Sequence, residues 1–152
     1  MGYGCEMTKH FPDTAFWAAY QGRFSGVLNW PDVEAFWASM AASSGGWFVF
    51  GTEQVAPDAT ATAAEFAETL GKATELINTR RDRSHCGAIY VDDIQSPTFI
   101  KIFDPAAMGS ACNISGIPVL PRWIISRIKP DNVPPPPPPE NLSLFKRLTR
   151  GA

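Results

Sequence analysis

Six consecutive prolines near the C-terminus, Pro134–Pro139, constrain the fold of this chain more than any other feature. Proline has a fixed φ and no backbone N–H, so the run can neither continue a helix nor lie within a sheet. The folded part of the chain must therefore come before the run. We predict a single globular domain over residues 1–130, a proline-rich spacer over 131–140 and a short basic amphipathic tail over 141–152.

The proline run is expected to act as a spacer. Six prolines favour polyproline II, a stiff rod that rises about 3.1 Å per residue and so spans about 19 Å. Proline ligands of SH3-type grooves usually carry a basic residue close by. Here the flanking residues are Val133 and Glu140, and the nearest cation is Lys129. A spacer that holds the tail away from the domain therefore fits the sequence better than a groove ligand.

The tail beyond the prolines combines apolar and basic side chains in a helical pattern. The apolar residues gather on one side of a helical wheel and the cations lie mostly on the other; the residues that we expect to bind a partner are Leu142, Leu144, Phe145, Lys146, Arg147 and Leu148. Nine or ten residues are too few for a stable helix alone in water, so such a segment is typical of peptides that fold in the groove of another protein. The alternatives are a frayed end, a strap packed on the domain, and membrane attachment, for which so few apolar residues give only marginal binding.

The net charge of −2 over 152 residues does not point to nucleic acid or to an anionic membrane. The charge is uneven, because residues 122–152 hold six cations and two acidic residues (net +4), whereas residues 1–121 hold seven and thirteen (net −6). No stretch approaches the roughly 18 apolar residues of a membrane span, and the first residues lack the apolar run of a signal peptide. We therefore expect a cytoplasmic protein with reduced thiols that binds protein rather than nucleic acid or membrane.

The chain has five tryptophans and a charged fraction of 18%, below the usual value of about 25%. Many large rings and few charges indicate apolar surface that another chain could cover. One prediction is therefore a homodimer with Trp30 or Trp123 in the contact. The alternative is an interior that these rings fill.

Two segments carry the apolar periodicity of helices packed on a sheet. In the segment that starts at Pro31, the proline and two acidic residues suit a first turn, and the predicted buried face is Val33, Phe36, Trp37, Met40 and Ala41. The longer segment, about Ala61 to Arg81, opens with the capping-box spacing of Thr62 and Glu65 and has the apolar stripe Ala63, Phe66, Leu70, Ala73 and Ile77. The earlier stretch 12–26 is less regular because glycines interrupt it, and residues 24–28 could be extended.

The strongest strand signals are Cys86–Asp93 and Thr98–Asp104, which are rich in β-formers and close enough to form a hairpin. Trp47–Gly51 is a short apolar run between glycines and predicts a buried strand. Val119–Ile128 predicts a further strand or a short helix, and the prolines at its start favour an edge position. These elements predict an α+β fold: a small antiparallel sheet of three to four strands with two main helices packed on one face.

No arrangement of residues in this sequence predicts a catalytic site, a metal site or a cofactor. The three cysteines, Cys5, Cys86 and Cys112, are widely spaced and form neither a disulfide framework nor a C-x-x-C pair. A metal site would need three or four convergent ligands, which no spacing motif supplies here. We therefore predict a non-catalytic accessory or adaptor protein that binds another protein through its tail. The alternative is a thiol-dependent redox or metal-delivery protein that uses Cys86 and Cys112.

Overall fold

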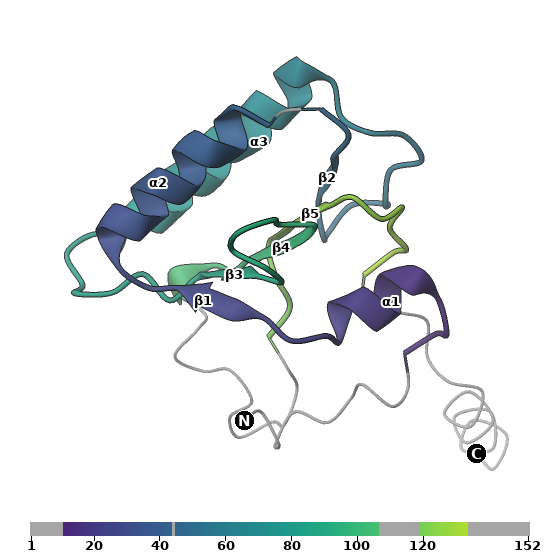
Figure 1. Ribbon diagram of the computed structural model, residues 1–152, viewed down its shortest axis with the longest axis horizontal. Coiled ribbons are helices and arrows are strands. Elements are labelled where there is room, and N and C mark those ends of the chain that lie inside the picture. The colour runs from purple at the N-terminus through teal and green to yellow at the C-terminus, as the bar shows by residue number, and fades with distance from the viewer. Residues whose placement is uncertain (1–10, 44, 107–118, 134–152) are drawn as a thin grey trace, which may run out of the picture.

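The computed structural model describes residues 11–43, 45–106 and 119–133, which form a five-stranded antiparallel sheet with helices on both faces (Figure 1). In spatial order, the strands are β1 (Ser25–Val27), β3 (Ile89–Val91), β4 (Phe99–Ile102), β5 (Trp123–Ser126) and β2 (Phe48–Gly51). The helices α2 (Trp30–Ala41) and α3 (Ala63–Asn78) cover one face, and the short α1 (Ala15–Tyr20) lies on the other. The predicted α+β class with an antiparallel sheet is confirmed. The predicted count of three to four strands is wrong, because residues 25–27 pair with β3 and add an edge strand.

The two long helices form where the local sequence predicts them. At the start of α3, Thr62 Oγ1 accepts the N–H of Glu65 and the Glu65 carboxylate accepts the N–H of Thr62. This capping box satisfies two donors that a first helical turn leaves unpaired. The buried residues of the two helices are Val33, Phe36 and Met40 in α2 and Phe66, Leu70, Ala73 and Ile77 in α3. Both stripes face the sheet, so the burial of apolar surface stabilises these helices more than intrinsic propensity does.

β3 and β4 form the predicted hairpin, with Ile89 opposite Ile102 in the register. The connecting turn is organised by Asp92, whose carboxylate accepts the backbone N–H groups of Thr98 (2.9 Å) and Phe99 (3.0 Å) and the Thr98 hydroxyl. Desolvation acts to raise the pKa of Asp92, but these hydrogen bonds outweigh it and lower the pKa below its ordinary value. Asp92 therefore stabilises the hairpin turn.

β5 occupies an interior position between β4 and β2, and all four of its residues are buried. The predicted edge position is therefore wrong. Pro121 lies two residues before the strand begins, so its missing N–H removes no hydrogen bond from either ladder. The N–H of Arg122 instead donates to the carbonyl of Ile102 at 2.7 Å and starts the pairing with β4. The other proline of this segment, Pro118, lies outside the described residues.

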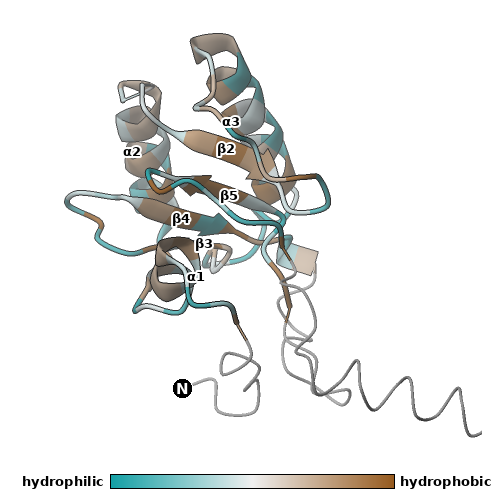
Figure 2. Cartoon of the chain, turned by 90° about the vertical axis from the view of Figure 1, so that its right-hand side faces the viewer, coloured by the Kyte–Doolittle hydropathy of each residue, from teal (hydrophilic) through white to brown (hydrophobic). Residues whose placement is uncertain are grey.

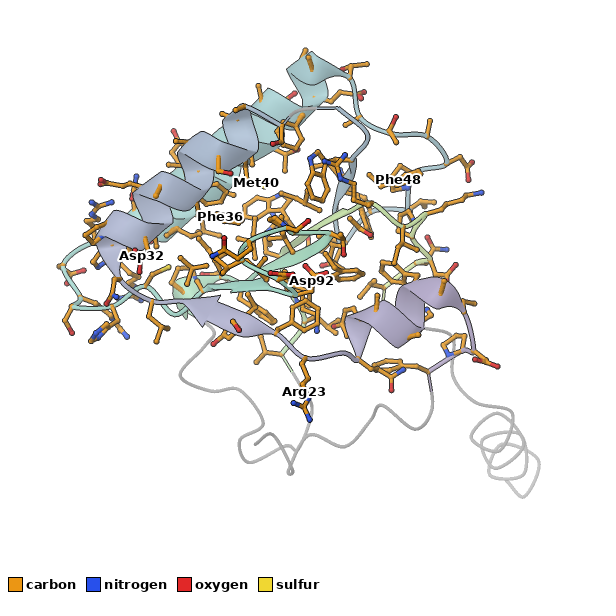
Figure 3. All side chains as sticks on the ribbon, in the orientation of Figure 1. Arg23, Asp32, Phe36, Met40, Phe48 and Asp92 are labelled. Atoms are coloured by element: carbon orange, nitrogen blue, oxygen red, sulfur yellow. The ribbon has the colours of Figure 1, made fainter. Side chains whose placement is uncertain are left out.

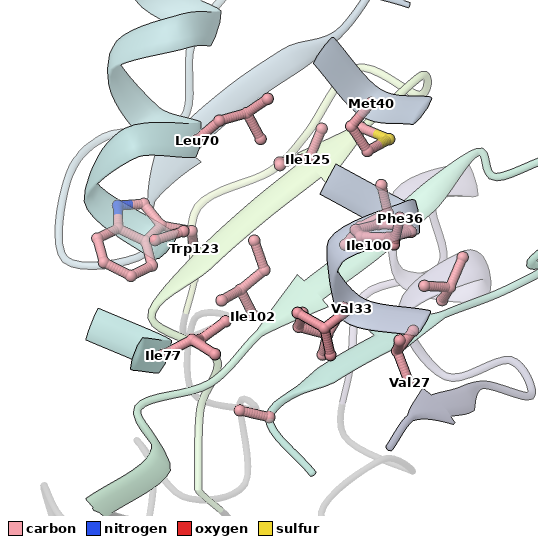
Figure 4. Close-up of a cluster of buried hydrophobic side chains, with 14 of the residues drawn as sticks. Val27, Val33, Phe36, Met40, Leu70, Ile77, Ile100, Ile102, Trp123 and Ile125 are labelled. Carbon is pink, nitrogen blue, oxygen red and sulfur yellow. The ribbon is translucent and has the colours of Figure 1, made fainter. Parts of the chain in front are cut away.

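The sheet separates two hydrophobic clusters, because successive residues of a strand point to opposite faces. Along β5, Trp123 and Ile125 belong to the cluster under α2 and α3 (Figure 4), whereas Ile124 belongs to the cluster with α1. Figure 2 shows strands β2 and β5 coloured mainly brown, as expected for strands that are buried on both faces. The domain therefore has three layers, and its sheet is buried from both sides where the helices cover it.

The tryptophans lie largely in the interior. Three of the five are buried: Trp17, Trp47 and Trp123. Of the two residues predicted for a dimer contact, Trp123 is only 8% exposed and so is not available for one. Trp30 is partly buried, donates its indole N–H to the Arg83 carbonyl at 2.7 Å and lies under the guanidinium of Arg81. The aromatic content is thus accounted for mainly by the interior of the domain.

Candidate functional site

The segment between β5 and the proline run is fixed to the α1 face of the sheet. Val133 is 5% exposed and belongs to the cluster of Phe16, Trp17, Tyr20, Phe50, Phe99 and Ile124. The Asp131 carboxylate accepts the Thr14 hydroxyl at 2.7 Å, and Asn132 Oδ1 accepts the N–H of Ala56 at 2.8 Å. In Figure 1, the yellow-green end of the described chain passes beside α1. The packed chain thus reaches Val133, three residues beyond the predicted domain boundary at residue 130.

The residues predicted to bind a partner lie outside the described part of the chain: Leu142, Leu144, Phe145, Lys146, Arg147 and Leu148. The six prolines lie outside it as well. The described residue that directly precedes them is Val133, and its side chain lies in the interior. The site that the structure describes is therefore the base of the tail.

A groove of about 430 Å³ runs between the edge strand β1 and helix α2. One wall is β1 with the two residues that follow it, and the other is a single face of α2 formed by Asp32, Ala35, Phe36 and Ser39. Ile94 and Pro97, from the turn between β3 and β4, close one side. Figure 3 shows Asp32 at the N-terminal end of α2 and Phe36 one turn further along, on the side of the helix that faces the sheet. The volume lies within the range of about 300–1,000 Å³ that is typical of binding pockets.

The groove is bordered by exposed apolar side chains. Leu28 is 47% exposed and Ile94 is 49% exposed. Within the described residues, the large apolar side chains with such exposure are Leu28, Val55, Ile94 and Leu120, and two of these four lie at this groove. Sequence reasoning missed the groove because its two walls, although consecutive in the chain, enclose a space only once β1 pairs with β3 and the distant turn with Ile94 and Pro97 folds beside them. The available signal was an isoleucine in a turn rich in polar residues.

A half-buried lysine on the opposite face of the sheet was also missed. Lys101, on β4, donates from Nζ to the Tyr20 carbonyl at 2.6 Å, and its Nζ lies 3.9 Å from the centroid of the Tyr20 ring and 4.1 Å from that of Phe24. Burial lowers the pKa of Lys101 to about 8. The Tyr20 carbonyl is at the C-terminal end of α1, where a cation complements the helix dipole. Lys101 therefore holds α1 against the sheet.

The thiol alternative rests on Cys86 and Cys112, and of these the structure describes Cys86. Cys86 is half-buried, and its N–H donates to the Leu28 carbonyl at 2.7 Å. Desolvation raises the pKa of its thiol, although hydrogen bonds from the backbone N–H groups that follow and the charge of Arg81 act in the other direction. A raised pKa disfavours the thiolate, which is the reactive form. The environment of Cys86 therefore does not favour a reactive thiolate.

Metal ligands do not converge in the part of the chain that the structure describes: no three His, Cys, Asp or Glu side chains there are grouped so as to bind an ion. The exposed His85 is next to Cys86 in sequence, and its Nδ1 lies 3.3 Å from Ser84 Oγ. Cys5, His10 and Cys112 lie outside the described residues.

No protein-family model matches this chain, and neither does any curated protein or solved structure. Among the described helices, none is long and apolar enough to cross a membrane. The features that bear on function are therefore those of the chain itself: the fixed base of the tail and the groove beside β1.

Proposed function

We propose that this protein is a non-catalytic adaptor whose C-terminal segment, residues 141–152, binds another protein. The observation that supports this most is the fixed base of the tail: the chain is packed on the domain as far as Val133, immediately before the six prolines. A stiff spacer that starts from a fixed point separates its far end from the domain, whereas a spacer on a loose loop would not.

The charge distribution favours the same function. The first 121 residues carry a net charge of −6, and residues 146–150 carry three cations. Opposite charges attract, but at physiological ionic strength the interaction is screened over about 8 Å. A polyproline rod of about 19 Å holds the cations more than two screening lengths from the base. The cations of the tail are then free to bind an acidic surface on a partner.

The apolar residues of the tail supply the affinity. Leu144 and Phe145 are worth up to about 2 kcal/mol each if both enter pockets on the partner. Removing both would then weaken binding by up to about three powers of ten, at 1.4 kcal/mol for each tenfold change. The stability of the domain should not change, because the proposal places both side chains on the partner and not on the domain.

Affinity capture from a cell extract tests the proposal. The full chain is compared with a chain that ends at Val133, with the double variant Leu144→Ala/Phe145→Ala, and with the control Ser143→Ala/Thr149→Ala. We expect the full chain and the control to retain a specific protein that the other two lose, with equal melting temperatures for all four. The proposal is wrong if the chain ending at Val133 captures the same protein, or if the double variant melts at a lower temperature and still binds.

Alkylation separates this function from the thiol alternative. Treatment of the folded protein with iodoacetamide modifies accessible cysteines and leaves the tail unchanged, because residues 134–152 contain no cysteine. We expect capture of the partner to persist after treatment. Loss of capture in a protein that is still folded would favour the thiol alternative instead.

A further inference from the structure

We infer that the groove between β1 and α2 binds the C-terminal segment of a second copy of this protein, so that copies associate head to tail. This inference rests on the proposed function, because it names the partner of the same tail. Three properties of the groove support it: an open strand edge, an apolar floor and an acidic end.

The open edge belongs to β1. β1 pairs with β3 on one side, with Ser25 opposite Val91 and Val27 opposite Ile89. On its other side, the described residues provide no strand. An edge strand of this kind can accept an extended peptide as a further strand, in which main-chain hydrogen bonds provide affinity and alternate side chains enter pockets.

In place of the helix that its pattern predicts, the tail can also bind such an edge as an extended segment, for which it has a suitable spacing. Leu142 and Leu144 are two residues apart, so both side chains lie on one face of an extended segment, with Ser143 on the other. The groove offers apolar surface to such a pair, namely Val27, Leu28, Ala35, Phe36, Ile94 and Pro97. Three residues of tail, 142–144, match the three residues of β1.

Charge favours one direction for the added strand. Asp32 is the one charged residue among the groove-lining residues, and it lies beside Asn29, which donates from Nδ2 to its carboxylate at 3.3 Å. The nearby Glu34 is already paired with Arg81, whereas Asp32 has no ion pair within the described residues. A tail that runs parallel to β1, with Leu142 level with Ser25 and Leu144 level with Val27, brings Lys146 level with Asn29 and Asp32.

The position of the base of the tail indicates a second copy rather than the same chain. Val133 belongs to the same cluster as Phe50, Phe99 and Ile124, which lie on β2, β4 and β5 on the α1 face. The groove lies at β1, the opposite edge of the sheet from β2, beside a helix on the other face (Figure 1). A stiff rod would have to bend around the sheet to reach the groove of its own chain. It needs no bend to reach the groove of another copy. Because such a contact uses two different surfaces, repeated contacts build an open chain of copies, or a closed ring where the rotation between copies allows it.

Two variants separate the groove from the tail. Ala35→Lys places a cation in the groove, where it repels the tail and fills space; Ala38→Lys is the matched control, because Ala38 is exposed on the same helix and does not line the groove. Leu142→Ser/Leu144→Ser removes the apolar anchors of the tail and leaves the groove intact. Sedimentation of each full chain over a wide range of concentration measures the association.

We expect the mass of the natural protein and of Ala38→Lys to grow with concentration above that of a monomer. Ala35→Lys and the double tail variant should each weaken association by about tenfold or more, since like charges and lost apolar anchors are each worth at least 1.4 kcal/mol. Mixing these two variants is the decisive measurement. Ala35→Lys retains an intact tail, and the double tail variant retains an intact groove. The mixture should therefore form a dimer of one copy of each variant and no larger assembly.

Other outcomes overturn the inference in distinguishable ways. A monomeric natural protein that still captures a partner through its tail leaves the proposed function standing and removes the groove as its site. A fluorescent peptide of residues 141–152 that binds the tail variant but not the natural, monomeric protein shows that each tail occupies its own groove. A dimer that neither Ala35→Lys nor the tail variant weakens uses another surface. A mixture that fails to pair removes the groove and the tail as partners.

Discussion

Replacing Lys101 by methionine should remove a specific part of the pH dependence of stability. Burial lowers the pKa of Lys101 from 10.5 to about 8. Between these two values the unfolded chain holds a proton that the folded protein has released, so the free energy of unfolding rises with pH. At 1.36 kcal/mol for each pKa unit, the full rise corresponds to about 3 kcal/mol. Methionine keeps an unbranched apolar stem on β4 and cannot titrate.

The assay is urea denaturation of both proteins at several pH values between 7 and 9.5. The difference in unfolding free energy between the natural protein and Lys101→Met isolates this one group, because the other titrating groups are common to both. Burial raises the pKa of Tyr20, so the unfolded tyrosine ionises before the folded one and lowers stability above about pH 10. The measurement therefore stops below that pH.

We expect the natural protein to gain about 2 kcal/mol relative to Lys101→Met between pH 7 and 9.5, since the rest of the rise lies above that window. Lys72→Met is the control, because Lys72 is exposed on α3 and pairs there with Glu68 at 3.2 Å. Its curve should run parallel to that of the natural protein. Parallel curves for the natural protein and Lys101→Met would refute the reasoning, since they would mean that Lys101 titrates alike in the folded and unfolded chains.

Two further predictions concern the base of the tail and the turn before β2. Val133→Ala should lower the free energy of unfolding by about 2 kcal/mol, because it removes two buried carbons and leaves a cavity. Val55→Ala, at an 80% exposed position, should have little effect in the same urea titration. Equal effects of the two substitutions would contradict the packing of Val133. Gly46→Ala should cost at least about 1 kcal/mol, since Gly46 has a φ of +80° and an added Cβ would lie 2.6 Å from Arg127 Nη1. Gly45→Ala is its control, because no atom lies within 4 Å of the added Cβ there; a neutral Gly46→Ala would show that the turn relaxes easily.

Elements whose determinants are local could be predicted from the sequence. The start of α3 depends on Thr62 and Glu65, which are three residues apart, and its buried stripe follows the helical period. The hairpin of β3 and β4 likewise joins segments that are close in the chain. In each case the residues that interact are neighbours in sequence, so a pattern records the contact.

The arrangement of the sheet could not be predicted in the same way. β5 pairs with β2, and Phe48 lies opposite Ser126, a partner far along the chain. The prolines before β5 are compatible with an edge strand, but Pro121 precedes the paired residues and is equally compatible with an interior one. The three-residue β1 carries too few residues for an alternating pattern, so its pairing with β3 is visible only in the structure.

The candidate site was predicted in part. The amphipathic tail is a local pattern, and it stays a prediction because residues 134–152 lie outside the described part of the chain. The groove brings together residues 25–29, one face of α2 and the turn that contains Ile94. In the sequence, the position of Lys101 fits a polar residue of an alternating strand. Its burial depends on Tyr20 and Phe24, which lie about eighty residues earlier. Such sites depend on tertiary contacts that no local pattern encodes.

The interior position of β5 has a mechanical consequence for any protein that pulls on the tail. A force applied beyond Val133 first meets the side chain of that residue and the hydrogen bonds of Asp131 and Asn132. If these yield, the load passes to β5, which is hydrogen-bonded to β4 on one side and to β2 on the other. An edge strand separates from a sheet when the hydrogen bonds of its single ladder break. β5 separates only when the hydrogen bonds of two ladders break together. The domain is therefore built to resist traction at its C-terminal end.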